Sequence, residues 1–277
     1  MIMKHLESAV EVVREMGYTP VYAALYGSQN YGLDVYGDQH QSDYDVKVVV
    51  MPTLHDVAFK ESTISKTVEY DGGQIDIKDA ISMSRIICKM NLQYLEILMT
   101  PFYLAFRGGE YMEELRYRLP HLLMEKSPAF AKAAYGMFSE KLNSCQKLTP
   151  SSEEKVRKYG YDGKHLHHAL RIKLMLEDFE KTNRIVLHPP VEQIPLLMQL
   201  KKNEIPLEQA VQLSRLWSDE ITRCADSLCA RGPMALPEEG CMTAEEAIMD
   251  ETRHAFYFAL KSSANGILPV QEVKTHE

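Results

Sequence analysis

The sequence lacks the features of a membrane-spanning or secreted protein. No apolar run approaches the roughly 18 residues that are needed to cross a bilayer. Residues 1–7 lack the apolar core of a signal peptide, so we expect a cytoplasmic protein without a membrane partner. Only five of the 277 residues are cysteine, and none forms a Cys-x-x-Cys pair. We interpret them as reduced thiols rather than as zinc ligands or disulfides.

The chain also lacks an excess of positive charge. It has 31 Lys and Arg against 39 Asp and Glu, a net charge of −8, which argues against broad nonspecific binding to nucleic acid. The stretch 141–173 is an exception, with eight Lys or Arg and three Asp or Glu. Hydrophobic residues make up 45% of the chain and charged residues 25%, which is typical of a globular protein and excludes a disordered one.

The hydrophobic pattern predicts an α+β fold, with a small mixed sheet followed by an all-helical domain. Strands are expected at 21–26 and 46–50, and a hairpin at 64–70 and 74–79 around Asp71-Gly72-Gly73. Helices are expected at 5–16, from about 79, and at 110–119, 128–147, 153–182, 191–200, 206–231 and 243–263. We therefore expect a mixed α/β domain at 1–115 and a helical domain at 116–277.

The segment with the clearest chemistry is Leu25-Tyr26-Gly27-Ser28, followed after fourteen residues by Asp43-Tyr44-Asp45. Side chains alternate along a strand, so Asp43 and Asp45 are expected on one face, opposite Val46, Val48 and Val50. Two neighbouring carboxylates repel each other, and a bound divalent cation relieves that repulsion. Oxygen ligands with few protein contacts suit Mg²⁺, so we expect Mg²⁺ or Mn²⁺ here.

Two further features extend this candidate site. Gly27-Ser28 ends a strand, where glycine lets the backbone approach a ligand and the next amides and hydroxyl can bind phosphate. Asp76 lies between Ile75 and Ile77, which are expected to face the core, so its carboxylate should face the other way. Asp43, Asp45 and Asp76 together predict a two-metal phosphoryl-transfer site. Asp71 and Asp79 are rival third acids.

These motifs resemble the nucleotidyltransferases of the DNA polymerase β superfamily, whose signature is Gly-Ser, a spacer, Asp-x-Asp and a later Asp. More narrowly, residues 27–33 and Ser42–Asp45 resemble the predicted nucleotidyltransferases of bacteria and phages that are linked to RNA repair, the RlaP family. The resemblance continues at 91–98 and 158–171 and spans about residues 20–175. The spacer 29–42 is a few residues longer than usual, and Val35–Gln41 could lengthen a loop over the nucleotide.

A second candidate feature is a basic helix. Asp162 is expected to cap a helix that begins at Gly163. Lys164, His167, His168 and Arg171 then share one face, and we expect Lys164, His168 and Arg171 to bind the triphosphate or a nucleic-acid backbone. The histidines of the cluster 165–168 could instead mark a metal site or a metal-dependent phosphohydrolase, but none of them is followed directly by an Asp, as such a motif would require.

The resemblance implies a metal-dependent transferase that moves a nucleoside monophosphate from an NTP to a hydroxyl acceptor, with RNA as the expected acceptor. In this interpretation Asp43 and Asp45 bind both metals, and Asp76 binds one and helps to deprotonate the acceptor. Ser28 holds the terminal phosphates. Two alternatives remain open: a transferase that adenylylates a protein, and a nucleotide-binding regulator without turnover.

Overall fold

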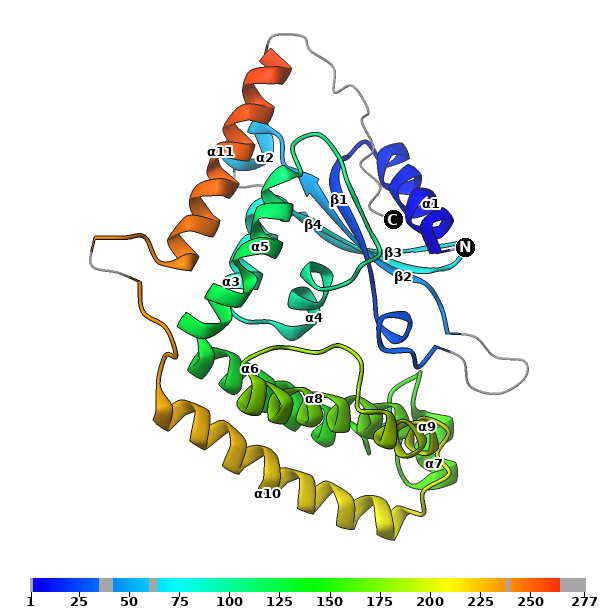
Figure 1. Ribbon diagram of the computed structural model, residues 1–277. Coiled ribbons are helices and arrows are strands. Elements are labelled where there is room, and N and C mark those ends of the chain that lie inside the picture. Colours follow the sequence, from blue (N-terminus) through cyan, green and yellow to red (C-terminus); the bar gives the residue numbers. More distant parts are fainter. Residues whose placement is uncertain (1, 35–41, 60–63, 238–239, 265–277) are drawn as a thin grey trace. The chain divides into compact units, whose positions relative to one another are not determined.

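The computed structural model describes residues 2–34, 42–59, 64–237 and 240–264, and it divides the chain into two compact units (Figure 1). One unit comprises the chain up to Glu125 together with the chain from Ala235 onward. The other unit is Lys126–Met234. The spacer residues Val35–Gln41 and the last residues, 265–277, lie outside the described residues.

A mixed five-stranded sheet forms the centre of the first unit, in the order β3-β4-β2-β1-β5. Strands β2 and β4 are parallel, and the other neighbouring pairs are antiparallel. The predicted α+β class with a small mixed sheet is therefore confirmed. The strands are β1 (Thr19–Tyr26), β2 (Asp45–Met51), β3 (Ser65–Tyr70), β4 (Gly73–Asp79) and β5 (Tyr103–Ala105).

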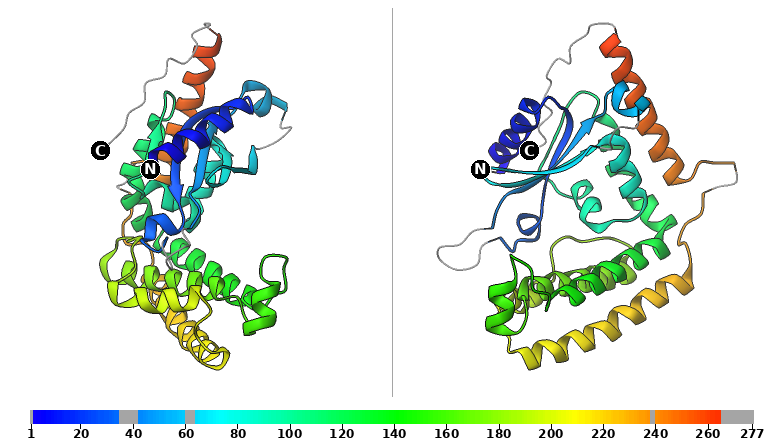
Figure 2. Two further views of the ribbon diagram at one scale, coloured as in Figure 1. Left: turned by 90° about the vertical axis from the view of Figure 1, so that its right-hand side faces the viewer. Right: turned by 180° about the vertical axis from the view of Figure 1, so that it is seen from behind.

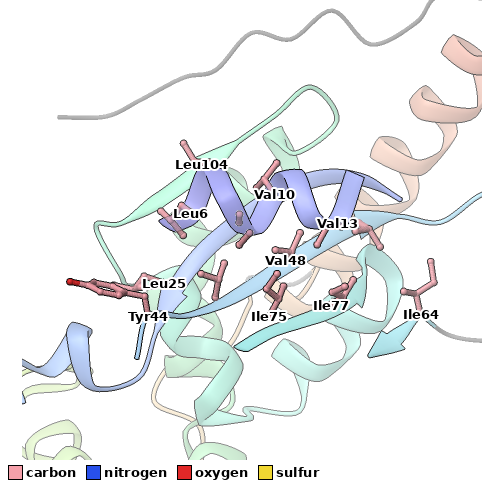
Figure 3. Close-up of a cluster of buried hydrophobic side chains, with 14 residues drawn as sticks. Leu6, Val10, Val13, Leu25, Tyr44, Val48, Ile64, Ile75, Ile77 and Leu104 are labelled. Carbon is pink, nitrogen blue, oxygen red and sulfur yellow. The ribbon is translucent and has the colours of Figure 1, made fainter. Parts of the chain in front are cut away.

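Helix α1 (Ile2–Glu15) lies over one face of this sheet and closes its main hydrophobic core (Figure 3). Its buried residues recur at helical spacing, so one stripe of the helix faces the strands. The strands present alternate residues to the same core, because successive side chains of a strand point to opposite faces. The core includes Leu6, Val10 and Val13 of α1 and Leu25, Val46, Val48, Val50, Ile75 and Ile77 of the strands.

The alternation in β2 leaves polar side chains on the face that α1 does not cover. Val46, Val48 and Val50 are fully buried in the core, as predicted, so Asp45 and Lys47 face the other way. Helix α3 (Ala80–Cys88) packs against β2 and β4 and is capped by Asp79, whose side chain accepts from Ser82 N at 2.8 Å. The remaining short elements of this part are η1 (Ser28–Tyr31), α2 (Leu54–Phe59), α4 (Leu92–Leu95) and η2 (Glu96–Leu98).

Helix α11 (Ala244–Ala264) belongs to the first unit. The expected boundary between residues 115 and 116 had placed it in the helical domain. It packs against α3 and α5 (Glu110–Glu125). The Ser84 hydroxyl lies 2.7 Å from that of Thr252 in a buried contact, and Ala244 N donates to Glu125 Oε2 at 2.8 Å. Helical periodicity shows which face of α11 is apolar but not which helices it packs against, so the sequence placed α11 with its neighbours in the chain.

The second unit is helical, and its longest helices α6 (Ser127–Ser144), α8 (Gly163–Thr182) and α10 (Leu207–Arg231) pack side by side (Figure 2). Aromatic residues contribute to its core. The rings of Phe130 and Phe179 pack edge to face with their centroids 4.7 Å apart, and Trp217 is buried. The unit is completed by α7 (Glu153–Tyr159), η3 (Val191–Gln193) and α9 (Ile194–Lys201), of which α9 packs against α8.

The helix predictions agree with the structure except at 110–119, where α5 continues through Pro120 to Glu125, and in the stretch 153–182. This stretch was expected as one helix, but it contains α7 and α8, separated at Gly160. Gly160 has a φ of 82°, a left-handed conformation that ends a helix and that glycine adopts readily. No helix within the described residues is both long and apolar enough to span a bilayer. All five cysteines lie in the described part of the chain and are free thiols.

Candidate functional site

The candidate site begins where β1 ends and β2 starts. Tyr26 pairs with Asp45 in the antiparallel register, so Gly27 follows directly beside the Asp45 carboxylate. A Cβ atom built on Gly27 would lie 3.7 Å from Asp45 Oδ2. Gly27 has a φ of 89° and a ψ of −151°, a backbone conformation that residues other than glycine rarely adopt. The structure therefore brings the predicted Gly27-Ser28 turn and Asp45 together.

A buried carboxylate, Glu96, holds this turn in place. Its Oε1 accepts from Gly27 N at 2.6 Å and from Asn30 Nδ2 at 2.9 Å, and its Oε2 accepts from the Tyr31 hydroxyl. Asn30 is also buried, donates to Leu25 O at 2.8 Å and accepts from the Thr100 hydroxyl at 2.7 Å. Because these polar groups satisfy one another away from water, the network fixes the backbone of the turn.

The sequence motifs assign no role to Glu96. The stretch 91–98 stands out by its resemblance, and one further signal in it points to Glu96. Glu96 lies inside the apolar run Tyr94–Met99, and a charged residue in such a run is rarely buried unless it is paired. Its partners come from residues 65 or more positions away, so the sequence could flag the residue but could not identify what it binds.

We expect Glu96→Gln to destabilise the chain and loosen the turn. Hydrogen bonds to a charged group contribute about 1.5–3 kcal/mol, and the amide keeps only one acceptor oxygen for three donors. The free energy of unfolding should therefore fall by about 1–3 kcal/mol in urea denaturation followed by circular dichroism. Glu69→Gln, a change at an exposed site on β3, is the control and should stay within about 0.5 kcal/mol. Equal effects of the two changes would contradict the role of Glu96.

Asp43 and Asp45 lie together at the start of β2. Asp43 is exposed, and Asp45 is half-buried and accepts from Gln74 N at 3.2 Å through Oδ1. A Cβ atom on Gly73 would lie 3.1 Å from both Asp43 Cβ and Asp45 Oδ1, so the β3–β4 hairpin passes directly beside the two acids. Tyr44 between them is buried, and its ring stacks on that of His5 with the ring centroids 4.1 Å apart. The predicted alternation of this motif is confirmed.

Asp76 is the predicted third acid, and the structure places it beside Lys47. The two residues are register partners in the parallel pair of β2 and β4. Lys47 Nζ lies 2.7 Å from Asp76 Oδ2, which also accepts from the Tyr94 hydroxyl at 2.8 Å. Lys78 Nζ lies 3.5 Å from Oδ1. Both oxygens of this buried carboxylate therefore face cationic or hydrogen-bonding groups.

The electrostatics of this pair follow from burial and mutual attraction. Burial raises the pKa of Asp76, but the charge and hydrogen bond of Lys47, together with Tyr94 and Lys78, lower that pKa below its ordinary value overall. Burial lowers the pKa of Lys47, and Asp76 opposes that shift. A carboxylate whose pKa is lowered is a weak base, so this arrangement does not suit Asp76 to remove a proton from an acceptor hydroxyl.

The three predicted acids do not form one set of metal ligands. Among the residues that the structure describes, no group of three His, Cys, Asp or Glu side chains is placed to hold a metal ion. Asp43 and Asp45 remain next to each other and next to Gly27, whereas Asp76 is bound by Lys47. These donors do not fit two metals bridged by three carboxylates. The rival acid Asp79 caps α3.

The basic helix is α8, in the second unit. Asp162 caps it as predicted, accepting from Lys164 N at 3.0 Å. Lys164 is exposed, and His168 and Arg171 are half-buried. His167 does not join this face: it is buried, and its Nδ1 lies 2.9 Å from Leu197 O in α9. Burial lowers the pKa of His168 well below its usual value, so this imidazole is neutral at pH 7.

The lowered pKa of the buried His167 predicts how the stability of the second unit depends on pH. Burial lowers its pKa to about 3, whereas in the unfolded chain it is about 6.5. Between these values the unfolded chain binds a proton that the folded chain does not, so stability is full above pH 6.5 and is lost as the pH falls. One such group reduces the free energy of unfolding by about 1.5 kcal/mol between pH 6.5 and pH 5.

The fluorescence of Trp217, the single tryptophan and a buried residue of this unit, can follow the unfolding. Between pH 6.5 and pH 5, the free energy of unfolding of His167→Asn should therefore fall by about 1.5 kcal/mol less than that of the unaltered chain. His188→Gln, a change at an exposed histidine of the same unit, should leave the loss unchanged. An unaltered pH dependence in His167→Asn would show that folding does not lower the pKa of this imidazole.

Comparisons with known proteins give little further information. No family model matches the chain, and no curated protein matches it. Among solved structures, the chain is similar to a nucleotidyltransferase-like protein from Exiguobacterium sibiricum 255-15, with 16% identity, coverage of 97% of this chain and 98% of that chain, and a TM-score of 0.32.

Proposed function

We propose that this chain is a nucleotidyltransferase that moves a nucleoside monophosphate from an NTP to a hydroxyl acceptor. The acceptor oxygen would form a bond to the α-phosphorus, the bond from that phosphorus to the bridging oxygen would break, and pyrophosphate would leave. The hydroxyl proton would pass to water. One observation carries the proposal: a glycine turn fixed by Glu96 lies directly beside Asp45 at the edge where β1 ends and β2 begins.

The residues of the turn would bind the nucleotide. Backbone amides after Gly27 and the Ser28 hydroxyl are suited to the terminal phosphates, because a glycine turn lets the backbone come close to them. Asp43 and Asp45 would hold a divalent cation, Mg²⁺ or Mn²⁺, which when bound neutralises part of the phosphate charge. We place Asp76 as a positioning residue that orients Lys47, since its lowered pKa makes it a poor base.

We further propose RNA as the acceptor. The sequence motifs resemble an RNA-repair-associated family, and the second unit presents Lys164 and Arg171 on α8. Residues 141–173 as a whole carry an excess of Lys and Arg, which suits a phosphate backbone. Transfer to a protein hydroxyl is the alternative reaction.

A second candidate function is nucleotide binding without turnover. It is favoured by the ion pair between Lys47 and Asp76, because the third acid is already engaged in the folded chain. A protein of this kind would bind an NTP at Gly27-Ser28 and report its presence to a partner. It would share the nucleotide site with the transferase but would release no pyrophosphate.

The test is a transfer assay with each of the four NTPs labelled at the α-phosphate. The chain is incubated with Mg²⁺ or Mn²⁺ and with tRNA, cleaved RNA or total protein, and the label is located. We expect label on RNA together with released pyrophosphate. Label on protein would replace RNA by protein as the acceptor, and nucleotide binding without any transfer would support the regulator instead.

A further inference from the structure

Lys47 is the ion-pair partner of Asp76 in the proposed site, and its surroundings are unusual for a lysine. It is 3% exposed, in the middle of the sheet. Its Nζ lies 3.9 Å from the ring centroid of Tyr26 and 4.2 Å from that of Tyr94, and it pairs with Asp76 at 2.7 Å. Two aromatic faces and one carboxylate thus hold a single positive charge in a fixed place.

Stability alone does not explain a buried ion pair of this kind. Removing two charges from water costs so much that a well-packed apolar pair of similar volume is often as stable or more stable. The position of Lys47 suggests a different reason. It lies two residues after Asp45 on the same face of β2, about 6–7 Å along the strand, and therefore on the face that carries the candidate site.

The contacts of Asp76 show that Lys47 occupies the place where a second divalent cation would bind. A second divalent cation in this site would need an oxygen of Asp76, the only other carboxylate that the sequence motif supplies. Oδ2 already accepts from Lys47 and Tyr94, and Oδ1 faces Lys78 at 3.5 Å. The positive charge that a second metal would bring to this carboxylate is supplied by the Lys47 ammonium.

We propose that Lys47 takes the place of a second metal ion, so that the site binds one divalent cation, at Asp43 and Asp45, for each nucleotide. This inference rests on the proposed nucleotide site. It distinguishes the chain from a two-metal enzyme, in which three carboxylates share two cations. It also gives Asp76 a definite role, which is to hold the lysine rather than a metal.

The stoichiometry of Mn²⁺ tests the proposal. The chain is titrated with Mn²⁺ in the presence of a non-hydrolysable NTP analogue, and bound ion is counted by electron paramagnetic resonance against a protein-free blank. We expect one Mn²⁺ in total for each chain with bound analogue, and this count includes the ion that the phosphates of the analogue share with the chain. Two would overturn the inference and leave the nucleotide site standing. No binding of the analogue would overturn the proposed function and the inference together.

Variants of Lys47, Lys78 and Asp76 test the number of bound Mn²⁺ ions further. Lys47→Gln releases Asp76 and should allow a second Mn²⁺ to bind, whereas Lys78→Gln, its matched control, should not, because Lys47 still engages Asp76. Asp76→Asn gives an independent measurement that does not depend on the lysine variants folding. If Asp76 binds no metal, Asp76→Asn should leave the Mn²⁺ affinity within about twofold. A loss of tenfold or more would identify Asp76 as a ligand and contradict the proposal.

Discussion

Replacement of Lys47 by methionine is expected to lower the free energy of unfolding by about 3–5 kcal/mol. Removing one partner of a buried ion pair leaves the other charge uncompensated, and Asp76 would remain buried next to Tyr94 with only the more distant Lys78. Methionine keeps most of the apolar stem, so the loss reports the charge rather than the packing. Urea denaturation followed by circular dichroism measures it.

A double variant separates the charge from the position. Lys47→Met combined with Asp76→Leu removes both charges and should recover most of the lost stability, because an apolar pair of similar volume often replaces a buried ion pair without cost. Lys66→Met is the control on the same sheet, since Lys66 is exposed in β3, and it should change the free energy of unfolding by less than about 0.5 kcal/mol. A cost below about 1 kcal/mol for Lys47→Met would mean that Asp76 does not depend on this lysine.

The second large effect is expected on catalysis. Asp45→Asn removes a negative charge from the proposed cation site next to Gly27, and we expect nucleotidyl transfer to fall by about 10²–10³, or roughly 3–4 kcal/mol of transition-state stabilisation. The fold should persist, because the asparagine oxygen can still accept from Gln74 N and the repulsion with Asp43 is relieved. Initial rates with saturating Mg·NTP measure the effect.

The control for this change is Asp71→Asn. Asp71 is exposed in the turn between β3 and β4 and does not belong to the proposed site, so its rate should stay near that of the unaltered chain. Asp43→Asn should resemble Asp45→Asn. Turnover near the original value in either of the two site variants would remove both carboxylates from the proposed mechanism.

The local pattern of the sequence predicted much of the fold correctly. Alternation in Val46, Val48 and Val50 placed these residues in the core and the acids on the opposite face, as the structure shows. Asp162 was predicted as a helix cap and accepts from Lys164 N. Such features depend on neighbours within a few residues, so the sequence alone is sufficient to predict them.

Contacts between distant segments explain what the sequence could not predict. Strands β2 and β4 pair so that Lys47, rather than Asp45, lies opposite Asp76. A shift of one residue in that register would move every side chain of β4 to the other face, and no local signal specifies which residues are partners. Glu96 and its partner Asn30 are likewise 66 positions apart. The candidate acids could be predicted, but their neighbours could not.

The most direct measurement is a crystal structure of the chain with a non-hydrolysable NTP analogue and Mn²⁺. We predict that the terminal phosphates lie against the amides of the turn and the Ser28 hydroxyl, with one Mn²⁺ between the phosphates and Asp43 and Asp45. Lys47 should remain on Asp76. A nucleotide bound elsewhere, or bound at the turn without contact between its cation and Asp43 or Asp45, would contradict the proposed site.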